Sequence, residues 1–182
     1  MLKRKDTEME FKELIRARRS VRGYESAVDH GDLVAILKEA QQAPSWKNQQ
    51  TSRCYAVESP EVLGKLRGAL PAFNQNSSAN AALVVTTYVK NIVGFGTDGP
   101  VNEIGNGWGA CDLGLHDAYL ILAAKDHGYD TLIMGIRDAS LIRETLGIPE
   151  NEEIMSVIAV GTRRTATSER PRKELGEVAR FF

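Results

Sequence analysis

Two apolar segments with different patterns constrain the fold of this chain more than any other feature. Residues 82–89 (ALVVTTYV) form a β-branched run that is typical of a buried strand. Residues 108–127 place apolar side chains along a helical stripe, and residues 119–124 are almost wholly apolar, which predicts a long helix buried on several sides. Gly128 can end this helix because glycine tolerates the left-handed conformation.

Weaker patterns predict the remaining elements. Besides the long helix we expect helices at about 8–18, 33–40 and 60–70, and one that starts at Asp138 as N-cap and is closed by Gly147. Besides residues 82–89 we expect strands at 53–58, 131–135 and 154–160, with loops at 20–29, 44–51 and 90–105. Helices and strands intermingle without regular βαβ alternation, which favours an α+β fold over a doubly wound one. At this length we expect one domain, residues 1–182.

Basic residues gather at both ends of the chain. Residues 1–22 carry eight Lys/Arg against four Asp/Glu, residues 162–182 carry six against three, and the body between them is acidic. Arginine suits a phosphate because its guanidinium donates two parallel hydrogen bonds. The pattern indicates one anionic ligand held by both ends, although two solvated charged segments would give the same composition.

Composition and targeting signals suggest a cytoplasmic protein. The two cysteines, Cys54 and Cys111, lie 57 positions apart without a CxxC motif or a histidine at metal spacing, which argues against a disulfide framework and a metal site. The N-terminus lacks an apolar segment typical of a signal peptide, and no apolar run is long enough to span a membrane.

Several candidate motifs have simpler explanations. GFGTDG (94–99) matches the spacing of a dinucleotide-binding turn, but the polar, glycine-rich residues after it do not predict the helix that such a turn requires. His30, His116 and His127 lie singly, so surface or satisfied histidines are the better interpretation. The acidic side chains of the long helix, Asp112, Asp117 and Asp126, are interpreted as a solvated face or a subunit edge.

Five segments in a fixed order carry a family resemblance. RRSVRGY (18–24), APSWKNQQ (43–50), the long helix, GYDTLIMG (128–135) and RPRK (170–173) together resemble the nitroreductase family of FMN-dependent oxidoreductases, from about residue 11 to 182. The resemblance implies an α+β fold with a central, mostly antiparallel sheet flanked by helices, and an interlocked homodimer with two FMN sites at its interface. Departures at Thr51 and Gly135, where members often carry proline and some carry glutamate, bear on substrate preference.

The resemblance also implies FMN-binding residues. Those at the phosphate are Arg18, Arg19, Ser20, Arg170 and Arg172, while Arg16, Arg163, Arg164 and Lys173 are interpreted as surface charge. Those at the flavin ring are Arg22 near N1, Asn74 at the pyrimidine edge, and the backbone of Ile133, Met134, Gly135 and Ile136 near N5 and O4. Those in a loop from the other subunit are Pro44, Ser45, Trp46 and Asn48, with Gln50 just beyond.

The implied activity is a ping-pong hydride transfer. NAD(P)H, a transient co-substrate, reduces FMN, and a flat electron-poor acceptor such as a nitroaromatic or quinone then takes the hydride. No catalytic side chain and no metal are expected, because the flavin N5 carries the hydride. Two alternatives stay open: a flavin enzyme of the same fold with another reaction, of dehalogenase or dehydrogenase type, and a non-enzymatic anion- or nucleic-acid-binding protein. The acidic body disfavours binding to nucleic acid.

Overall fold

A five-stranded antiparallel sheet forms the centre of the computed structural model, which describes residues 10–182. The strands are β1 (Tyr24–Ala27), β2 (Ser52–Val57), β3 (Ala82–Val89), β6 (Asp130–Met134) and β7 (Glu152–Arg163). Their order is β1-β7-β3-β2, with β6 also paired to β7. β7 is the longest strand and contacts three others, so it connects the two halves of the sheet.

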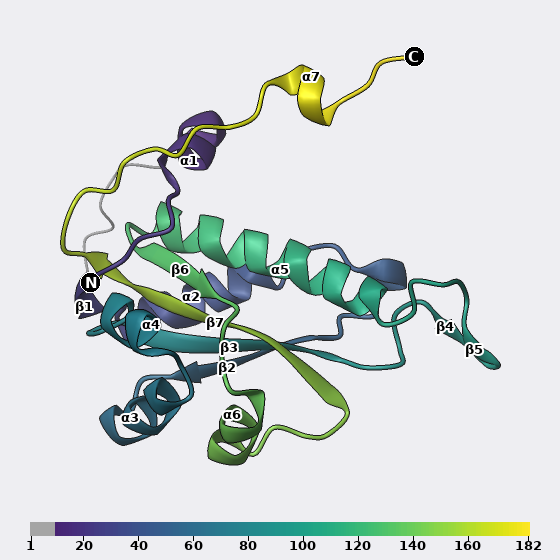
Figure 1. The fold of residues 1–182 in the computed structure, drawn as a ribbon, viewed down its shortest axis with the longest axis horizontal. Coiled ribbons are helices and arrows are strands. Elements are labelled where there is room, and N and C mark those ends of the chain that lie inside the picture. Colours follow the sequence, from purple (N-terminus) through teal and green to yellow (C-terminus); the bar gives the residue numbers. More distant parts are fainter. Residues whose placement is uncertain (1–9) are drawn as a thin grey trace.

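Helices cover both faces of this sheet (Figure 1). α2 (His30–Ala40) and α5 (Gly107–Asp126) lie on one face, and α3 (Pro60–Gly68) and α6 (Ala139–Leu146) lie on the other. β3 supplies both cores because successive side chains point to opposite faces: Leu83 and Val85 join the α3/α6 core, whereas Val84 joins the α2/α5 core. The predicted α+β fold with an antiparallel sheet flanked by helices is confirmed.

Local capping chemistry explains several boundaries. Asp138 accepts a hydrogen bond from the Leu141 N–H at 3.0 Å, and Gly147 ends α6 in the left-handed conformation (φ 64°), both as predicted. Gly161 allows a close approach of β1 and β7, because a Cβ there would collide with the carbonyl oxygen of Ser26. This close approach holds β1 against the end of β7.

Two predictions about loops are wrong, and one short helix was not predicted. Tyr24–Ala27 lies in the predicted loop 20–29 but forms β1, because the end of β7 offers it a pairing edge. Residues 90–105 contain a short hairpin of β4 (Phe95–Gly96) and β5 (Gly99–Pro100). An unpredicted short helix, α4 (Ala72–Ser77), follows α3.

The first described helix and the segment after β7 lie side by side (Figure 1). α1 (Phe11–Ala17) contains Arg16 and precedes Arg18 and Arg19; its predicted start at Glu8 lies outside the described residues. After β7 the chain passes α1 and extends away from the sheet to the short helix α7 (Leu175–Val178) (Figure 1). In residues 10–182 no helix combines the length and the apolar character needed to cross a membrane.

Candidate functional site

Arginines from both ends of the chain line one pocket. Arg18 and Arg19 follow α1, and Arg172 belongs to the C-terminal segment; the pocket has a volume of about 360 Å³. Its other lining residues come from α1, α5 and the tail: Ile15, Arg16, Ala118, Ile121, Leu122 and Glu169. We call this the arginine pocket. Arg16, interpreted from sequence as surface charge, therefore lies in its wall.

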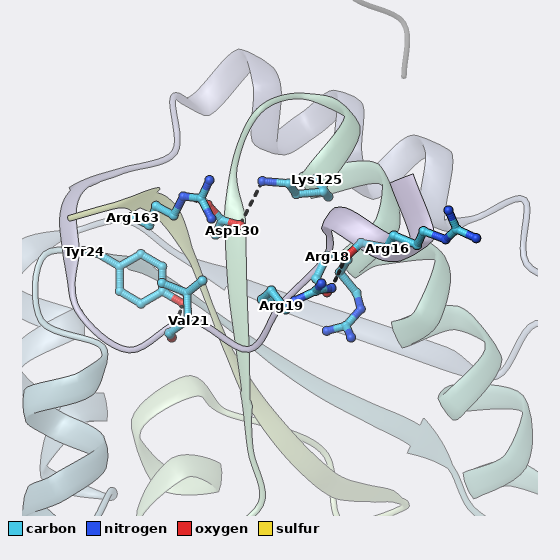
Figure 2. A network of polar contacts seen from close by, with 8 residues as sticks. All are labelled: Arg16, Arg18, Arg19, Val21, Tyr24, Lys125, Asp130 and Arg163. Carbon is cyan, nitrogen blue, oxygen red and sulfur yellow. Dashed lines mark hydrogen bonds and ion pairs between the residues drawn. The ribbon is translucent and has the colours of Figure 1, made fainter. Parts of the chain in front are cut away.

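The arginine pocket has an excess of positive charge. Burial and the neighbouring guanidinium groups of Arg172 and Arg19 lower the pKa of Arg18, which means that these cations repel one another. Arg19 donates to the carbonyls of Arg16 and Arg18 (Figure 2). It also pairs with Glu169 at 3.1 Å. Glu169 is 71% exposed, so this carboxylate neutralises the cluster only weakly.

Backbone contacts hold the segment 18–24 beside β6. Ser20 forms a parallel bridge with Thr131, and the Val21 N–H donates to the Thr131 carbonyl at 2.9 Å. The Gly23 N–H donates to the carbonyl of Ser77 at 2.8 Å. These contacts leave Arg22 exposed between buried neighbours.

A buried carboxylate stabilises the start of β6. Asp130 lies between Lys125 and Arg163, at 3.0 and 3.5 Å (Figure 2). Arg163, interpreted as surface charge, is indeed exposed, and its side chain also compensates the buried Asp130. Sequence distance concealed this pair, because the two residues meet only through the β6-β7 pairing.

The loop 44–50 lies at the other end of α5. Its Trp46 N–H donates to Asp112 Oδ2 at 2.9 Å, and the Trp46 and Trp108 rings meet edge to face, with their centroids 4.8 Å apart. The Gln50 N–H donates to Ser45 Oγ at 3.0 Å. Lys47, Asn48 and Gln50 all have positive φ, near 50°. The loop is thus a compact turn anchored to α5 by a carboxylate.

A second pocket, of about 420 Å³, lies beneath this loop, and we call it the loop pocket. Its walls include Pro44, Ser45, Gln50, Cys54, Asp112 and His116. In this wall, His116 lies 4.0 Å from Cys54 Sγ and 3.5 Å from one carboxylate oxygen of Asp117. The other carboxylate oxygen of Asp117 accepts a hydrogen bond from Thr86 at 3.1 Å. Burial and the charge of Asp117 raise the pKa of Cys54 to about 12, so its thiol stays protonated and unreactive at neutral pH.

The prediction that Asp112 and Asp117 lie on a solvated face of α5 or at a subunit edge is therefore corrected. Asp112 and Asp117 are 6% and 8% exposed, so they are not on a solvated face; each accepts a hydrogen bond from another element. His116, which lacks a partner in sequence, has Cys54 and Asp117 as neighbours. In residues 10–182 no group of three or more His, Cys, Asp or Glu side chains is arranged to hold a metal ion.

The end of β6 presents backbone to the outside. Ile133 and Ile136 are 46% and 65% exposed, Gly135 is exposed, and Met134 between them is buried in the core. β6 pairs with β7 as far as Met134 and Val157. The segment 133–136 is therefore an exposed surface at the end of β6, which we call the shelf. The segment 18–24 lies against the same strand.

The predicted site residues fall into separate groups in one chain. Arg18, Arg19 and Arg172 share the arginine pocket, and Ser20 follows Arg19 along the chain. Of the predicted loop residues, Pro44, Ser45 and Gln50 line the loop pocket, whereas Trp46 and Asn48 do not. The two pockets use different faces of α5, since His116 and Ala118 are roughly 200° apart around a helix. Arg170 does not line the arginine pocket and contributes its carbonyl to Arg172, and Asn74 is buried in α4.

The model of the nitroreductase family matches residues 15–162, which is most of the chain and includes all of these elements except the tail. The chain belongs to the nitroreductase family. A relative from Bacillus subtilis (strain 168), named "Putative NAD(P)H nitroreductase YdgI", is 28% identical over 184 residues, which covers 84% of this chain and 88% of the relative. A relative from Archaeoglobus fulgidus, named "Putative NADH dehydrogenase/NAD(P)H nitroreductase", is 29% identical and covers 81% of this chain and 82% of its own.

Solved structures share the fold of this nitroreductase-family chain. The structure of "a putative nitroreductase in complex with FMN" from Exiguobacterium sibiricum 255-15 has a TM-score of 0.83 at 22% identity, covering 97% of this chain and 99% of that one. A nitroreductase family protein from Clostridium novyi NT has a TM-score of 0.73 at 26% identity and covers 86% of both chains.

Sequence reasoning missed three residues of the site in this nitroreductase-family protein. Asp112 anchors loop 44–50, Glu169 pairs with Arg19, and Asp130 compensates Lys125 and Arg163. Asp112 had one usable signal, because it stands on a mostly apolar stripe of the long helix, where an unpaired carboxylate would be costly. Glu169 had none, since its partner Arg19 is distant in sequence, and of the two partners of Asp130 only Lys125 is near it in the chain.

Proposed function

We propose that this protein is an FMN-dependent oxidoreductase that uses NAD(P)H to reduce nitroaromatics, quinones or similar flat electron-poor acceptors. The observation that carries the proposal is the arginine pocket, where Arg18, Arg19 and Arg172 from opposite ends of the chain converge on one space. Family membership and the names of the relatives, which include NAD(P)H nitroreductases, support the same activity.

The charges of the arginine pocket fit the phosphate of FMN. This phosphate carries about two negative charges at neutral pH and accepts several charge-assisted hydrogen bonds. Arg18 and Arg172 repel each other when no anion lies between them. A bound dianion would therefore reduce this repulsion and would not have to break an existing ion pair of these two arginines. Ser20 and Arg170 do not line the pocket but lie close to these arginines in sequence, and we propose that they reach the phosphate once FMN is bound.

The shelf 133–136 fits the edge of a flavin ring. The shelf lies at the end of β6, and the exposed Arg22 follows Ser20, which pairs with Thr131 of the same strand. In the proposed complex Ile133, Met134, Gly135 and Ile136 line the ring, Asn74 contacts its pyrimidine edge, and Arg22 places a cation near N1. Bound FMN would supply hydride acceptance from NAD(P)H and hydride delivery to the acceptor, so no nucleophile or metal ligand is required.

We propose a homodimer in which each chain, residues 1–182, is one domain. α5 exposes Leu115 and Tyr119, at 41% and 43%, and the extended tail exposes Leu175, Val178 and Phe181. A second copy that covers these side chains would bring its own loop 44–50 toward the flavin, which accounts for the separation of the two pockets in one chain. Pro44, Ser45, Trp46, Asn48 and Gln50 are proposed as that contribution.

The direct test is a flavin spectrum of the purified protein with anaerobic titration by NADH and by NADPH. We expect bound FMN, bleaching by a nicotinamide, and reoxidation by a nitroaromatic or a quinone at ordinary enzyme rates. Colourless protein that takes up no added FMN would contradict the proposal. Flavin that is reduced but not reoxidised by these acceptors would favour another reaction on the same fold. Sedimentation of the protein tests the dimer.

A further inference from the structure

Arg137 follows the exposed end of β6 and holds it in place. Its Nη1 donates to the carbonyl of Gly135 at 3.1 Å, and its Nη2 donates to the carbonyl of Ile154 on β7. The β6-β7 ladder stops at Met134 and Val157, so Ile154 lies beyond the last paired residues. The guanidinium therefore connects β6 and β7 at the point where their backbone pairing has ended.

The segment that Arg137 holds is also fixed at its far side. The Asp138 N–H donates to the carbonyl of Ala69 at 2.7 Å, and the Asp138 side chain caps α6. Between these two anchors Gly135 and Ile136 stay exposed. The shelf is thus held by the hydrogen bonds of Arg137 and Asp138, while Gly135 and Ile136 remain exposed to solvent.

The charge of Arg137 is not neutralised by a neighbouring carboxylate. Within the part of the chain that the structure describes, no Asp or Glu lies within 4.0 Å of its guanidinium, and its Nε is buried without a hydrogen-bond partner. Both of its acceptors are neutral carbonyls. A full positive charge therefore lies just behind the shelf, in a partly buried place where water screens it less than at the surface.

The hydrogen bond to Gly135 transmits this charge outward. The Gly135 carbonyl and the Ile136 N–H belong to the same peptide unit, and a charged donor on the carbonyl polarises that unit, which strengthens its N–H as a donor. Among residues 10–182 no acceptor for the Ile136 N–H is recorded, and Ile136 is exposed. The shelf thus offers an amide whose donor strength depends on Arg137.

We infer that Arg137 is a positioning residue for the redox reaction: it aims and polarises the Gly135–Ile136 peptide toward the flavin edge and so favours the reduced flavin. The inference rests on the proposed function. Its physical basis is that reduction adds negative charge to the ring, and a fixed donor and cation stabilise the charged form more than the neutral one. The expected consequence of removing Arg137 is a lower midpoint potential of the flavin and slower reduction by NAD(P)H.

Arg143 provides the matched control. It also donates to backbone carbonyls, those of Ile148, Pro149 and Glu152, but these lie in the connection between α6 and β7 and not at the shelf. Arg143→Gln therefore removes a comparable set of structural hydrogen bonds without touching the peptide that faces the proposed flavin edge. A merely structural role of Arg137 would give the two variants the same behaviour.

The experiment compares the FMN-loaded wild type, Arg137→Gln, Arg137→Lys and Arg143→Gln. The measurements are the midpoint potential by anaerobic dye titration, FMN affinity by fluorescence quenching, and stopped-flow reduction by NAD(P)H. We expect Arg137→Gln to lower the potential and to slow reduction about tenfold, roughly 1.4 kcal/mol of barrier, with FMN affinity changed much less. Arg137→Lys keeps the cation and should lie between Arg137→Gln and the wild type, which keeps the test valid if Arg137→Gln does not fold.

Two results would overturn the inference: an unchanged potential in both Arg137 variants, or an equal shift in Arg143→Gln. Failure of the proposed function has a different signature, because the wild type itself would then bind no FMN or show no reduction by either nicotinamide. In that case the inference fails with it, since no flavin would lie at the shelf.

Discussion

The arginine pocket and the loop pocket lie on different faces of the same helix and differ in how their charges are balanced. In the arginine pocket, Arg18, Arg19 and Arg172 face one exposed carboxylate, Glu169. In the loop pocket, Asp112 accepts from Trp46; next to its wall, Asp117 accepts from Thr86 and lies 3.5 Å from His116 without a hydrogen bond to it. The difference indicates that the first pocket needs an external anion, whereas the polar groups of the second mainly hold the protein itself in shape.

The largest expected effect is the loss of FMN affinity in Arg18→Ala. Charge-assisted hydrogen bonds contribute about 1.5–3 kcal/mol, so the Kd for FMN should rise about 10- to 150-fold. The stability of the FMN-free protein should stay the same or increase, because the variant removes a cation that Arg172 and Arg19 repel. Fluorescence titration and thermal unfolding of the FMN-free protein measure the two quantities. An unchanged Kd would show that the arginine pocket is not the phosphate site.

Asp112→Ala should have the opposite profile. It leaves the partly buried Trp46 N–H without its acceptor, which should lower the free energy of unfolding by about 1–3 kcal/mol. FMN affinity should fall less than in Arg18→Ala, and only because loop 44–50 loses its anchor. Asp112→Asn keeps an acceptor oxygen and should recover most of the stability. If Asp112→Ala affected FMN affinity more than stability, the loop pocket would have to be reinterpreted as a ligand site.

The thiol of Cys54 reports on the closure of the loop pocket. Its raised pKa, about 12, means that the folded protein keeps a proton that the unfolded chain releases near its ordinary value of about 8.5. Stability should therefore fall as the pH rises above about 9, because the unfolded state then binds fewer protons than the folded one. Cys54→Ser, whose hydroxyl does not titrate in this range, should reduce that slope in denaturant titrations at pH 8 and pH 10. An identical slope in the variant would mean that the pocket is open to water.

The smallest expected effect is that of Glu169→Gln. This change removes the carboxylate that pairs with Arg19, and exposed ion pairs contribute about 0–1 kcal/mol, so FMN should bind up to about fivefold more tightly. The gain should shrink in high salt, which screens exposed pairs. Glu174→Gln, on the same tail, serves as the control, because the hydrogen bonds of Glu174 lie within α7 and not at Arg19. Weaker binding in Glu169→Gln would mean that Glu169 helps the pocket rather than competing with a ligand.

Most of the fold was accessible from local patterns. The apolar run 82–89 and the long helix match β3 and α5 closely, and Asp138 and Gly147 mark the ends of α6, because burial patterns and caps act within a few residues. β1 was missed because Tyr24–Ala27 has no strand pattern of its own and pairs only where the end of β7 offers an edge.

Sequence alone determined the family resemblance, the α+β class and the excess of arginine at both chain ends, because these depend on residue order, periodicity and composition. Only the tertiary structure decided which charges meet. Arg18 and Arg172 share a pocket, Arg163 compensates Asp130, Asp112 anchors Trp46, and Arg137 holds the end of β6. Electrostatic and hydrogen-bond energies depend on distances of a few ångströms, and for residues distant in sequence those distances follow from strand pairing and helix packing.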